Sequence, residues 1–261
     1  MTEVAHYDFS SLINAFRAVG VQPGDIVFSH ANIGFFGFPA EGRDQETICK
    51  IIHEAFFDVL GESGTLVLPG FTHSACRKEA FDPLSSQGIG GVFADWFLSR
   101  TQSVRSLDPN FSVIAEGARA KELTANVSLD SFGKDSFWER LTQKKGRIVN
   151  LNLNVGFNAL IHHAEWLVEA PWRMDKAFEG TVLVDEEDRT VVVNYFCQRP
   201  DHAYVDYDRF ATLAEDAGLV RRAKVGRGEI TSILAQDCVD FFVSSFEKDP
   251  FFLGATQKVQ C

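Results

Sequence analysis

The sequence predicts an α/β fold in which helices cover a sheet, and three observations support this prediction. Ile26–Ser29 and Thr65–Pro69 are short runs of the kind that form buried strands. Thr47–Leu60 and Gly91–Arg100 follow them, each after a loop, and have the spacing of helices. A strand-like segment that begins at Arg147 is again followed by a helical pattern. Strands that alternate with helices are typical of α/β proteins.

The other elements of the first half follow in chain order. Phe9–Val19 has helical spacing and precedes the first strand. A turn at Asp108 leads into a strand that reaches Ala115. Two short helices are then predicted, at Ala118–Leu123 and at Phe137–Leu141. The loops after the first two strands carry His30 and His73, and this carboxyl edge is where open α/β sheets bind ligands.

Residues 147–171 combine a strand, a turn and a helix. The strand alternates two kinds of residue, apolar Val149, Leu151, Leu153 and Val155 with polar Asn150, Asn152 and Asn154. Asn is a poor strand former, so we expect these side chains to line a polar cavity or to bond neighbouring loops. Asn158 then predicts the cap of a helix that runs from Ala159 until Pro171 stops it.

One pair on this helix could carry chemistry. His162 and Glu165 are three residues apart, so their side chains share one helix face. A carboxylate beside an imidazole fixes its tautomer and raises its basicity, as a general base requires. An ordinary polar pair on a solvated helix face has the same spacing. His163 points about 100° away from His162 and cannot face the same site.

Strand signals dominate from residue 178 onward. Thr181–Val184 and Thr190–Phe196 flank an acidic turn and predict an antiparallel hairpin. Helices are expected at Phe210–Ala217 and Cys238–Phe246, with further strand signals between Leu219 and Ile233. No linker, repeat or low-complexity segment interrupts the chain. We therefore expect one domain over residues 1–261, with residues 177–235 as a β-rich lobe within it.

Composition narrows the function classes. The 261 residues are 45% hydrophobic and 23% charged, as in soluble globular proteins. The net charge of −11 argues against non-specific nucleic-acid binding and against docking on anionic membranes. Five cysteines are scattered without paired spacing, at Cys49, Cys76, Cys197, Cys238 and Cys261. Such thiols, with no signal peptide and no apolar run that could span a bilayer, predict a cytoplasmic protein.

Several other chemistries find little support. The GxSxG, Walker A and GxGxxG motifs are absent. A metal site built on His162, His163 and Glu165 would lack the usual helical ligand spacing, although His30, His73 or Asp108 could join it from loops. We therefore expect no metal, and a metal-dependent hydrolase and a non-catalytic binding protein remain as alternatives.

Five spaced segments carry a family resemblance. PGDIVFSHANIGFFG, SGTLVLPGFTHS, SVRSLDPNFSVIAEG, FGKDSFWERL and LIHHAEW occur in this order. Together they resemble the aminoglycoside 3-N-acetyltransferase family, from about Val19 to Pro171. The resemblance implies a three-layer α/β/α core with a mixed sheet. It also implies transfer of an acyl group from acyl-coenzyme A, as acetyl-CoA or a longer thioester, to an amine.

The resemblance also implies roles for single residues. The family's His-x-x-Glu element matches His162 and Glu165, as base and orienting carboxylate. The residues implied in cofactor binding are His30, Ala31, Asn32, Phe36, Phe71, Thr72, Arg105 and Ser106. The residues implied in acceptor binding are Asp108, Asn110 and Phe111.

Two departures from the family pattern bear on the acceptor. Asp108 stands where members that modify antibiotics usually carry His, and Ala31 replaces a Ser. The residues of these segments resemble those of a branch of the family connected with surface-polysaccharide biosynthesis. This resemblance implies a nucleotide-linked amino sugar as acceptor. The alternative is an aminoglycoside, and the oligomeric state, monomer or homodimer, stays open.

Overall fold

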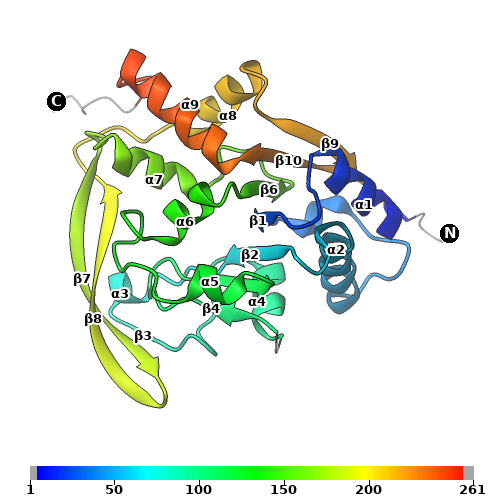
Figure 1. Ribbon diagram of the computed structural model, residues 1–261, viewed down its shortest axis with the longest axis horizontal. Coiled ribbons are helices and arrows are strands. Elements are labelled where there is room, and N and C mark those ends of the chain that lie inside the picture. Colours follow the sequence, from blue (N-terminus) through cyan, green and yellow to red (C-terminus); the bar gives the residue numbers. More distant parts are fainter. Residues whose placement is uncertain (1–4, 101, 255–261) are drawn as a thin grey trace.

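A seven-stranded mixed sheet forms the centre of the computed structural model, which describes residues 5–100 and 102–254 (Figure 1). Cys261, one of the five thiols expected to be unpaired, lies outside these residues. In spatial order the strands are β4 (Val104–Arg105), β5 (Val113–Gly117), β2 (Thr65–Pro69), β1 (Ile26–Phe28), β6 (Arg147–Leu151), β10 (Gly228–Leu234) and β9 (Arg221–Val225). The central strands β2, β1 and β6 are parallel, and the outer pairs are antiparallel.

Helices cover both faces of this sheet because successive strand residues point to opposite sides. Val27 and Val149 pack in one core, whereas Phe28 and Ile148 pack in the other. The first face is covered by α1 (Phe9–Ala18), α2 (Gln45–Leu60) and α4 (Val92–Leu98). The second face is covered by α5 (Ala120–Thr124), α6 (Phe137–Gln143), α7 (Leu160–Leu167), α8 (Tyr207–Asp216) and α9 (Ala235–Lys248). The three-layer α/β/α prediction is confirmed.

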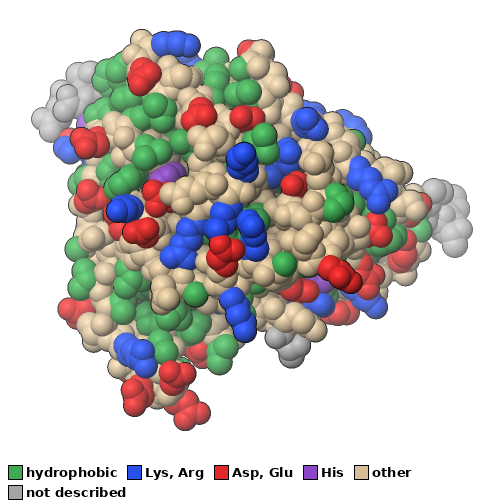
Figure 2. Space-filling view, in the orientation of Figure 1, with side chains coloured by type: hydrophobic (Ala, Val, Ile, Leu, Met, Phe, Trp, Pro, Cys, Tyr) green, Lys and Arg blue, Asp and Glu red, His purple; other side chains and the backbone are tan. Residues whose placement is uncertain are grey.

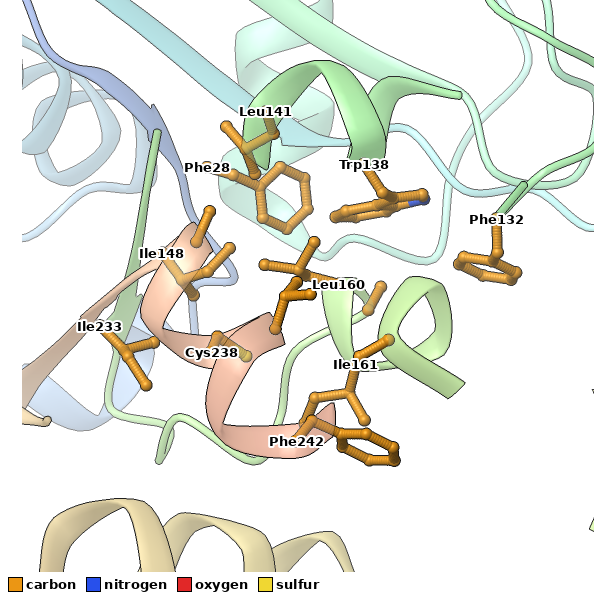
Figure 3. Close-up of a cluster of buried hydrophobic side chains, with 14 of the residues drawn as sticks. Phe28, Phe132, Trp138, Leu141, Ile148, Leu160, Ile161, Ile233, Cys238 and Phe242 are labelled. Atoms are coloured by element: carbon orange, nitrogen blue, oxygen red, sulfur yellow. The ribbon is translucent and has the colours of Figure 1, made fainter. Parts of the chain in front are cut away.

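The second core holds α7 against the sheet. Figure 3 shows Leu160 and Ile161 of α7 among Trp138, Ile148 and Phe242. All five side chains are fully buried or nearly so, and burying one large apolar side chain stabilises a fold by roughly 1.5–3 kcal/mol. The apolar face of α7 is therefore anchored, and its other face is fixed in direction.

A long hairpin projects from this core at the left of Figure 1. It consists of β7 (Arg173–Val184) and β8 (Glu187–Gln198), and β3 (Ala80–Phe81) pairs with β7 to complete a three-stranded sheet. Asp185 and Glu186 make its turn, and both have positive φ, as a two-residue hairpin turn requires. Figure 2 shows hydrophobic side chains gathered over this part of the visible face.

The stretch 177–235 divides between the two sheets. β10 pairs with β6 of the central sheet, and β9 pairs with β10. The apolar side chains of Ile230 and Ile233 in β10 are buried in the two cores, which explains why this strand joins the central sheet instead of the hairpin. Only the first part of the stretch belongs to the projecting hairpin.

The strand and helix predicted within residues 147–171 are both shorter in the structure. β6 ends at Leu151 because Asn152 takes the left-handed conformation that Asn tolerates. The carbonyl oxygens of Asn154 and Phe157 each accept a hydrogen bond of 2.8 Å from Asn150. The prediction that these Asn side chains bond loops is thus confirmed. Asn158 accepts from Leu160 N at 2.9 Å at the start of α7, and Glu169, also left-handed, follows its end.

Two short helical turns complete the fold, η1 (Ile33–Phe36) after β1 and α3 (Ser74–Arg77) after β2. Both follow the carboxyl ends of parallel strands, so they border the region where ligands are expected. Within the described residues no helix is long and apolar enough to cross a membrane.

Candidate active site

The helix α7 brings His162 and Glu165 together. His162 Nδ1 lies 2.8 Å from Glu165 Oε2, and the Glu165 side chain has no exposed surface whereas that of His162 is 22% exposed. His163 points elsewhere, with its Nδ1 2.7 Å from the carbonyl oxygen of Phe132. The one-turn spacing predicted from the sequence therefore forms a direct contact in the structure.

Glu165 is the centre of a network that the sequence did not reveal. Its Oε1 accepts hydrogen bonds from Trp172 Nε1 at 2.8 Å and from the hydroxyl of Tyr207 at 2.9 Å. Its Oε2 accepts one from Arg173 Nε at 2.8 Å. Burial alone would raise the pKa of Glu165, but the Arg173 cation and these donors lower it below its ordinary value. Glu165 is therefore a buried carboxylate paired with a buried guanidinium.

The same network affects His162. Burial and the nearby Arg173 cation lower the pKa of His162, and Glu165 opposes this shift only in part. The imidazole is thus neutral at pH 7. Arg173 Nη2 lies 2.8 Å from His162 Nδ1 and 2.5 Å from the Tyr207 hydroxyl. With a proton on Nδ1, His162 donates a hydrogen bond to the Glu165 carboxylate. With a lone pair on Nδ1, it accepts one from Arg173. Only the first tautomer leaves a lone pair on Nε2.

His162 lies on the wall of a cavity of about 1030 Å³. The cavity lies beyond the carboxyl ends of β1, β2 and β6, where the sequence predicted a ligand site. A second cavity of about 860 Å³ adjoins it and shares four lining residues, Asn32, Leu153, Asn154 and Asp208. His162 lies on the wall of the first cavity only.

The structure brings six of the predicted residues to this cavity. They are His30, Ala31, Asn32, Phe71, Phe111 and His162. His30 is buried, which lowers its pKa to about 3, and its Nε2 has no hydrogen-bond partner in the part of the chain that the structure describes. It is therefore a neutral imidazole, held edge-on between the rings of Phe28 and Phe157.

Phe36 and Thr72, both predicted to bind cofactor, lie away from the cavity wall. Phe36 is fully buried in the core on the opposite face of the sheet, where its ring packs against Tyr7. The Thr72 hydroxyl donates to the carbonyl oxygen of Pro109 at 2.6 Å and is also buried. Both positions follow strands, but their side chains point into the protein.

Arg105 and Ser106, predicted to bind the cofactor's phosphates, are engaged within the protein. The Arg105 guanidinium donates to Ser112 Oγ at 3.0 Å, to the carbonyl oxygen of Ser86 at 2.6 Å and to that of Gly70. Burial lowers its pKa to about 10. Ser106 Oγ accepts from Val113 N at 3.0 Å. Neither residue lines the cavity.

Asp108 and Asn110, predicted to contact the acceptor, are also buried within their own loop. One oxygen of Asp108 accepts from the backbone N–H groups of Asn110 and Phe111, at 2.8 and 3.0 Å. Burial raises the pKa of Asp108 despite these bonds. Asn110 Oδ1 accepts from Cys76 N at 3.2 Å. These side chains hold the loop, and the loop presents Phe111 to the cavity.

The described residues contain no group of three or more His, Cys, Asp or Glu side chains arranged to hold a metal ion.

Sequence reasoning missed four residues near His162, which are Trp172, Arg173, Tyr195 and Tyr207. Trp172 and Arg173 follow Pro171 directly, a position that could have drawn notice. Tyr207 is 42 residues from Glu165, and no local pattern connects the two.

Comparisons of the sequence with known proteins match one protein family. A sequence profile of the family described as aminoglycoside 3-N-acetyltransferase matches residues 30–247. Aminoglycoside N(3)-acetyltransferase VII of Streptomyces paromomycinus is 31% identical over 88% of this chain and 88% of its own length. Aminoglycoside N(3)-acetyltransferase III of Pseudomonas aeruginosa is 26% identical over 90% and 92%.

Solved structures share the fold. The binary complex of AAC-IIIb with CoASH superposes with a TM-score of 0.80 at 24% identity, covering 92% of this chain and 96% of that one. The aminoglycoside acetyltransferase AAC(3)-Xa gives 0.78 at 25% identity, covering 92% of each chain.

Proposed function

Because the chain belongs to the aminoglycoside 3-N-acetyltransferase family, we propose that it acetylates an amine of an amino-sugar acceptor with acetyl-CoA, using His162 as base. Membership makes it an acyl-CoA-dependent N-acyltransferase. The observation that carries the proposal is the neutral His162 on the cavity wall. Its Nδ1 contacts a buried carboxylate, and its Nε2 makes no hydrogen bond to the described residues.

The geometry supports a direct acyl transfer. The acceptor's neutral amine attacks the thioester carbonyl, so a C–N bond forms and the C–S bond breaks. His162 Nε2 takes the proton that the nitrogen loses and passes it to the departing thiolate, which leaves as the CoA thiol. Glu165 stabilises the transient imidazolium and keeps its proton on Nδ1. A positioned base of this kind contributes about 10²- to 10⁴-fold in rate.

The two adjoining cavities offer a path for an elongated thioester. Asn32 and Asn154 line both, and the loop that begins at His30 borders the first. Arg222 and Lys224 in the second cavity pair with Glu229, whereas the exposed Arg227 side chain has no partner among the described residues. We assign the CoA phosphates to Arg227 in this second cavity. Arg105, which the sequence favoured for that role, is occupied by Ser86, Ser112 and Gly70.

The comparisons bear on the acceptor. The sequence favoured a nucleotide-linked amino sugar of polysaccharide biosynthesis, with an aminoglycoside as the alternative. The curated relatives named above are aminoglycoside acetyltransferases, so they favour the alternative. Aminoglycosides are therefore the first acceptors to test.

A free-thiol release assay with acetyl-CoA tests the proposal. We expect thiol release that requires an amine acceptor, with mass spectrometry showing one acetyl group on the acceptor nitrogen. Kanamycin, a simple glucosaminide and a nucleotide-linked amino sugar form the panel. Acetyl-CoA that neither binds, by calorimetry, nor releases thiol with any of them would reject the function.

A further inference from the structure

The wall of the cavity beside His162 is aromatic. His73, Phe111 and Tyr195 line it, from the loop before α3, the loop before β5 and the strand β8. Their rings touch, since the centroids of His73 and Phe111 and those of Phe111 and Tyr195 are each 4.8 Å apart. Phe111 contacts Phe132 at 4.7 Å, and Phe132 contacts His162 at 5.0 Å. A chain of ring contacts, which passes through the buried Phe132, therefore links this wall to the proposed base.

Carboxylates are scarce on the same wall. Asp206 and Asp208 are the acidic residues of the cavity within the described chain, and both lie at the start of α8. Asp206 caps that helix by accepting from Arg209 N at 2.9 Å, and Asp208 accepts from Asn154 Nδ2 at 2.7 Å. Glu165 is sealed beneath His162 by its own donors. The aromatic surface itself presents no negative charge.

The net charge of −11 does not change this picture. The acidic side chains are spread over the molecule, and Figure 2 shows them interspersed with Lys and Arg on the visible face. A polycationic acceptor such as kanamycin needs several carboxylates to replace the water around its ammonium groups, because unpaired charges are costly to desolvate. A flat or apolar ring, in contrast, gains by packing on aromatic faces.

We propose that this cavity selects an acceptor with one amine on a weakly charged scaffold that carries a flat ring, rather than a polycation. The proposal rests on the proposed function and narrows its acceptor. The amine lies at His162 Nε2, and the flat ring packs over His73, Phe111 and Tyr195. A chain of the aminoglycoside acetyltransferase family would then differ from its named relatives in the charge of its acceptor.

Two glucosaminides with the same amine provide a matched test. We compare 4-nitrophenyl β-D-glucosaminide with methyl β-D-glucosaminide and with kanamycin in the thiol-release assay. The aryl compound is expected to give a kcat/KM about two- to tenfold above the methyl compound, because an aromatic contact contributes about 0.5–1.5 kcal/mol beyond area burial. It is also expected to exceed kanamycin. A kcat/KM for kanamycin equal to or above that of the aryl compound would overturn the proposal.

A charge introduced into the wall gives the reciprocal test. His73 has φ 53°, a conformation that Asp and Asn tolerate. Both His73→Asp and His73→Asn lose the ring, but only His73→Asp adds a charge. We therefore expect the kcat/KM for kanamycin relative to the aryl glucosaminide to be about tenfold higher in His73→Asp than in the neutral His73→Asn. Equal ratios in both variants would show that wall charge does not decide the acceptor.

Binding keeps this proposal separate from the proposed function. Calorimetric titration of the protein with kanamycin and with 4-nitrophenyl β-D-glucosaminide, in the presence of CoA, needs no turnover. Tighter binding of the aryl compound supports the proposal even where no thiol is released, and that silence counts against the transfer reaction alone. Tighter binding of kanamycin rejects the proposal whatever the catalytic result.

Discussion

Two clusters of polar side chains, one centred on helix α7 and one on residues 105–112, differ in what they can do. His162, Glu165 and Arg173 form the first, and Arg105 and Asp108 belong to the second. In the first, the guanidinium and carboxylate pair with each other and leave an imidazole on the cavity wall. In the second, Arg105 donates to the carbonyl oxygens of Ser86 and Gly70 in other loops, and Asp108 accepts from backbone N–H groups of its own loop. A polar cluster can act on a ligand only when one of its groups faces the cavity and keeps a free donor or acceptor atom.

Replacing His162 by alanine should have the largest effect on activity. We expect thiol release to fall by about 10²- to 10⁴-fold, because the base is lost. The free energy of unfolding should change little, since His162 is partly exposed and its ring fills no closed core. Acetyl-CoA binding by calorimetry and thermal melting are the controls. Turnover near that of the wild type, with both controls normal, would remove His162 from the mechanism.

Replacing Arg173 by methionine should shift the pH dependence. The Arg173 cation lowers the pKa of His162, so activity in the wild type declines only at a pH below the ordinary histidine value. Without that cation the pKa of His162 rises, and the acid limb of kcat/KM moves to higher pH. The pKa of Glu165 rises too. Because protonation removes the carboxylate that orients His162, this change also moves the acid limb to higher pH.

Arg173→Lys is the matched control, because it keeps the positive charge but loses the fork of donors. We expect its acid limb to stay closer to that of the wild type. Breaking the buried pair with methionine should also lower the free energy of unfolding by about 3–5 kcal/mol. An acid limb that stays in place in Arg173→Met would separate Arg173 from the basicity of His162.

Replacing Arg105 by methionine tests the second cluster. Three acceptors, Ser112 Oγ and the carbonyl oxygens of Ser86 and Gly70, would lose a donor. We expect the free energy of unfolding to fall by about 1–3 kcal/mol in urea titrations, with KM for acetyl-CoA unchanged. Arg17→Met is the control for losing an arginine, because Arg17 is exposed and its ion pair with Asp58 contributes at most about 1 kcal/mol.

A different outcome for Arg105→Met would restore the role predicted from the sequence. If stability is retained while KM for acetyl-CoA rises tenfold or more, Arg105 binds the cofactor. The second cluster would then bind a ligand as well as hold the fold, and the contrast with the first cluster would be wrong.

The difference between the clusters also explains what could be predicted from the sequence. The alternation of strands and helices sets the layers, and the i,i+3 spacing on one helix is enough to join His162 and Glu165. The direction of a loop side chain depends on tertiary contacts instead. Arg105 turns inward because Gly70, 35 residues earlier, offers its carbonyl oxygen, and such contacts leave no periodic signal.

The same reasoning covers the residues that sequence analysis missed. Arg173 begins β7 and Tyr207 begins α8, and the path of the chain through the hairpin brings both to Glu165. The sequence shows that these residues are Arg and Tyr, but it does not show that both side chains contact Glu165. The aromatic wall has the same origin, since its rings come from three separate elements.

Replacing Tyr207 by phenylalanine should have a small effect on activity, and the result would show whether its hydroxyl only holds Glu165. Tyr207 and Trp172 both donate to Glu165 Oε1, but Tyr207 also lines the cavity whereas Trp172 is fully buried. If both residues only hold Glu165, Tyr207→Phe and Trp172→Phe should each reduce kcat by about two- to tenfold, the equivalent of one hydrogen bond of about 0.5–1.5 kcal/mol. A loss near 10³-fold in Tyr207→Phe alone would contradict this. It would make the Tyr207 hydroxyl a second proton donor at the site, because Tyr207, unlike Trp172, lines the cavity as well as bonding Glu165.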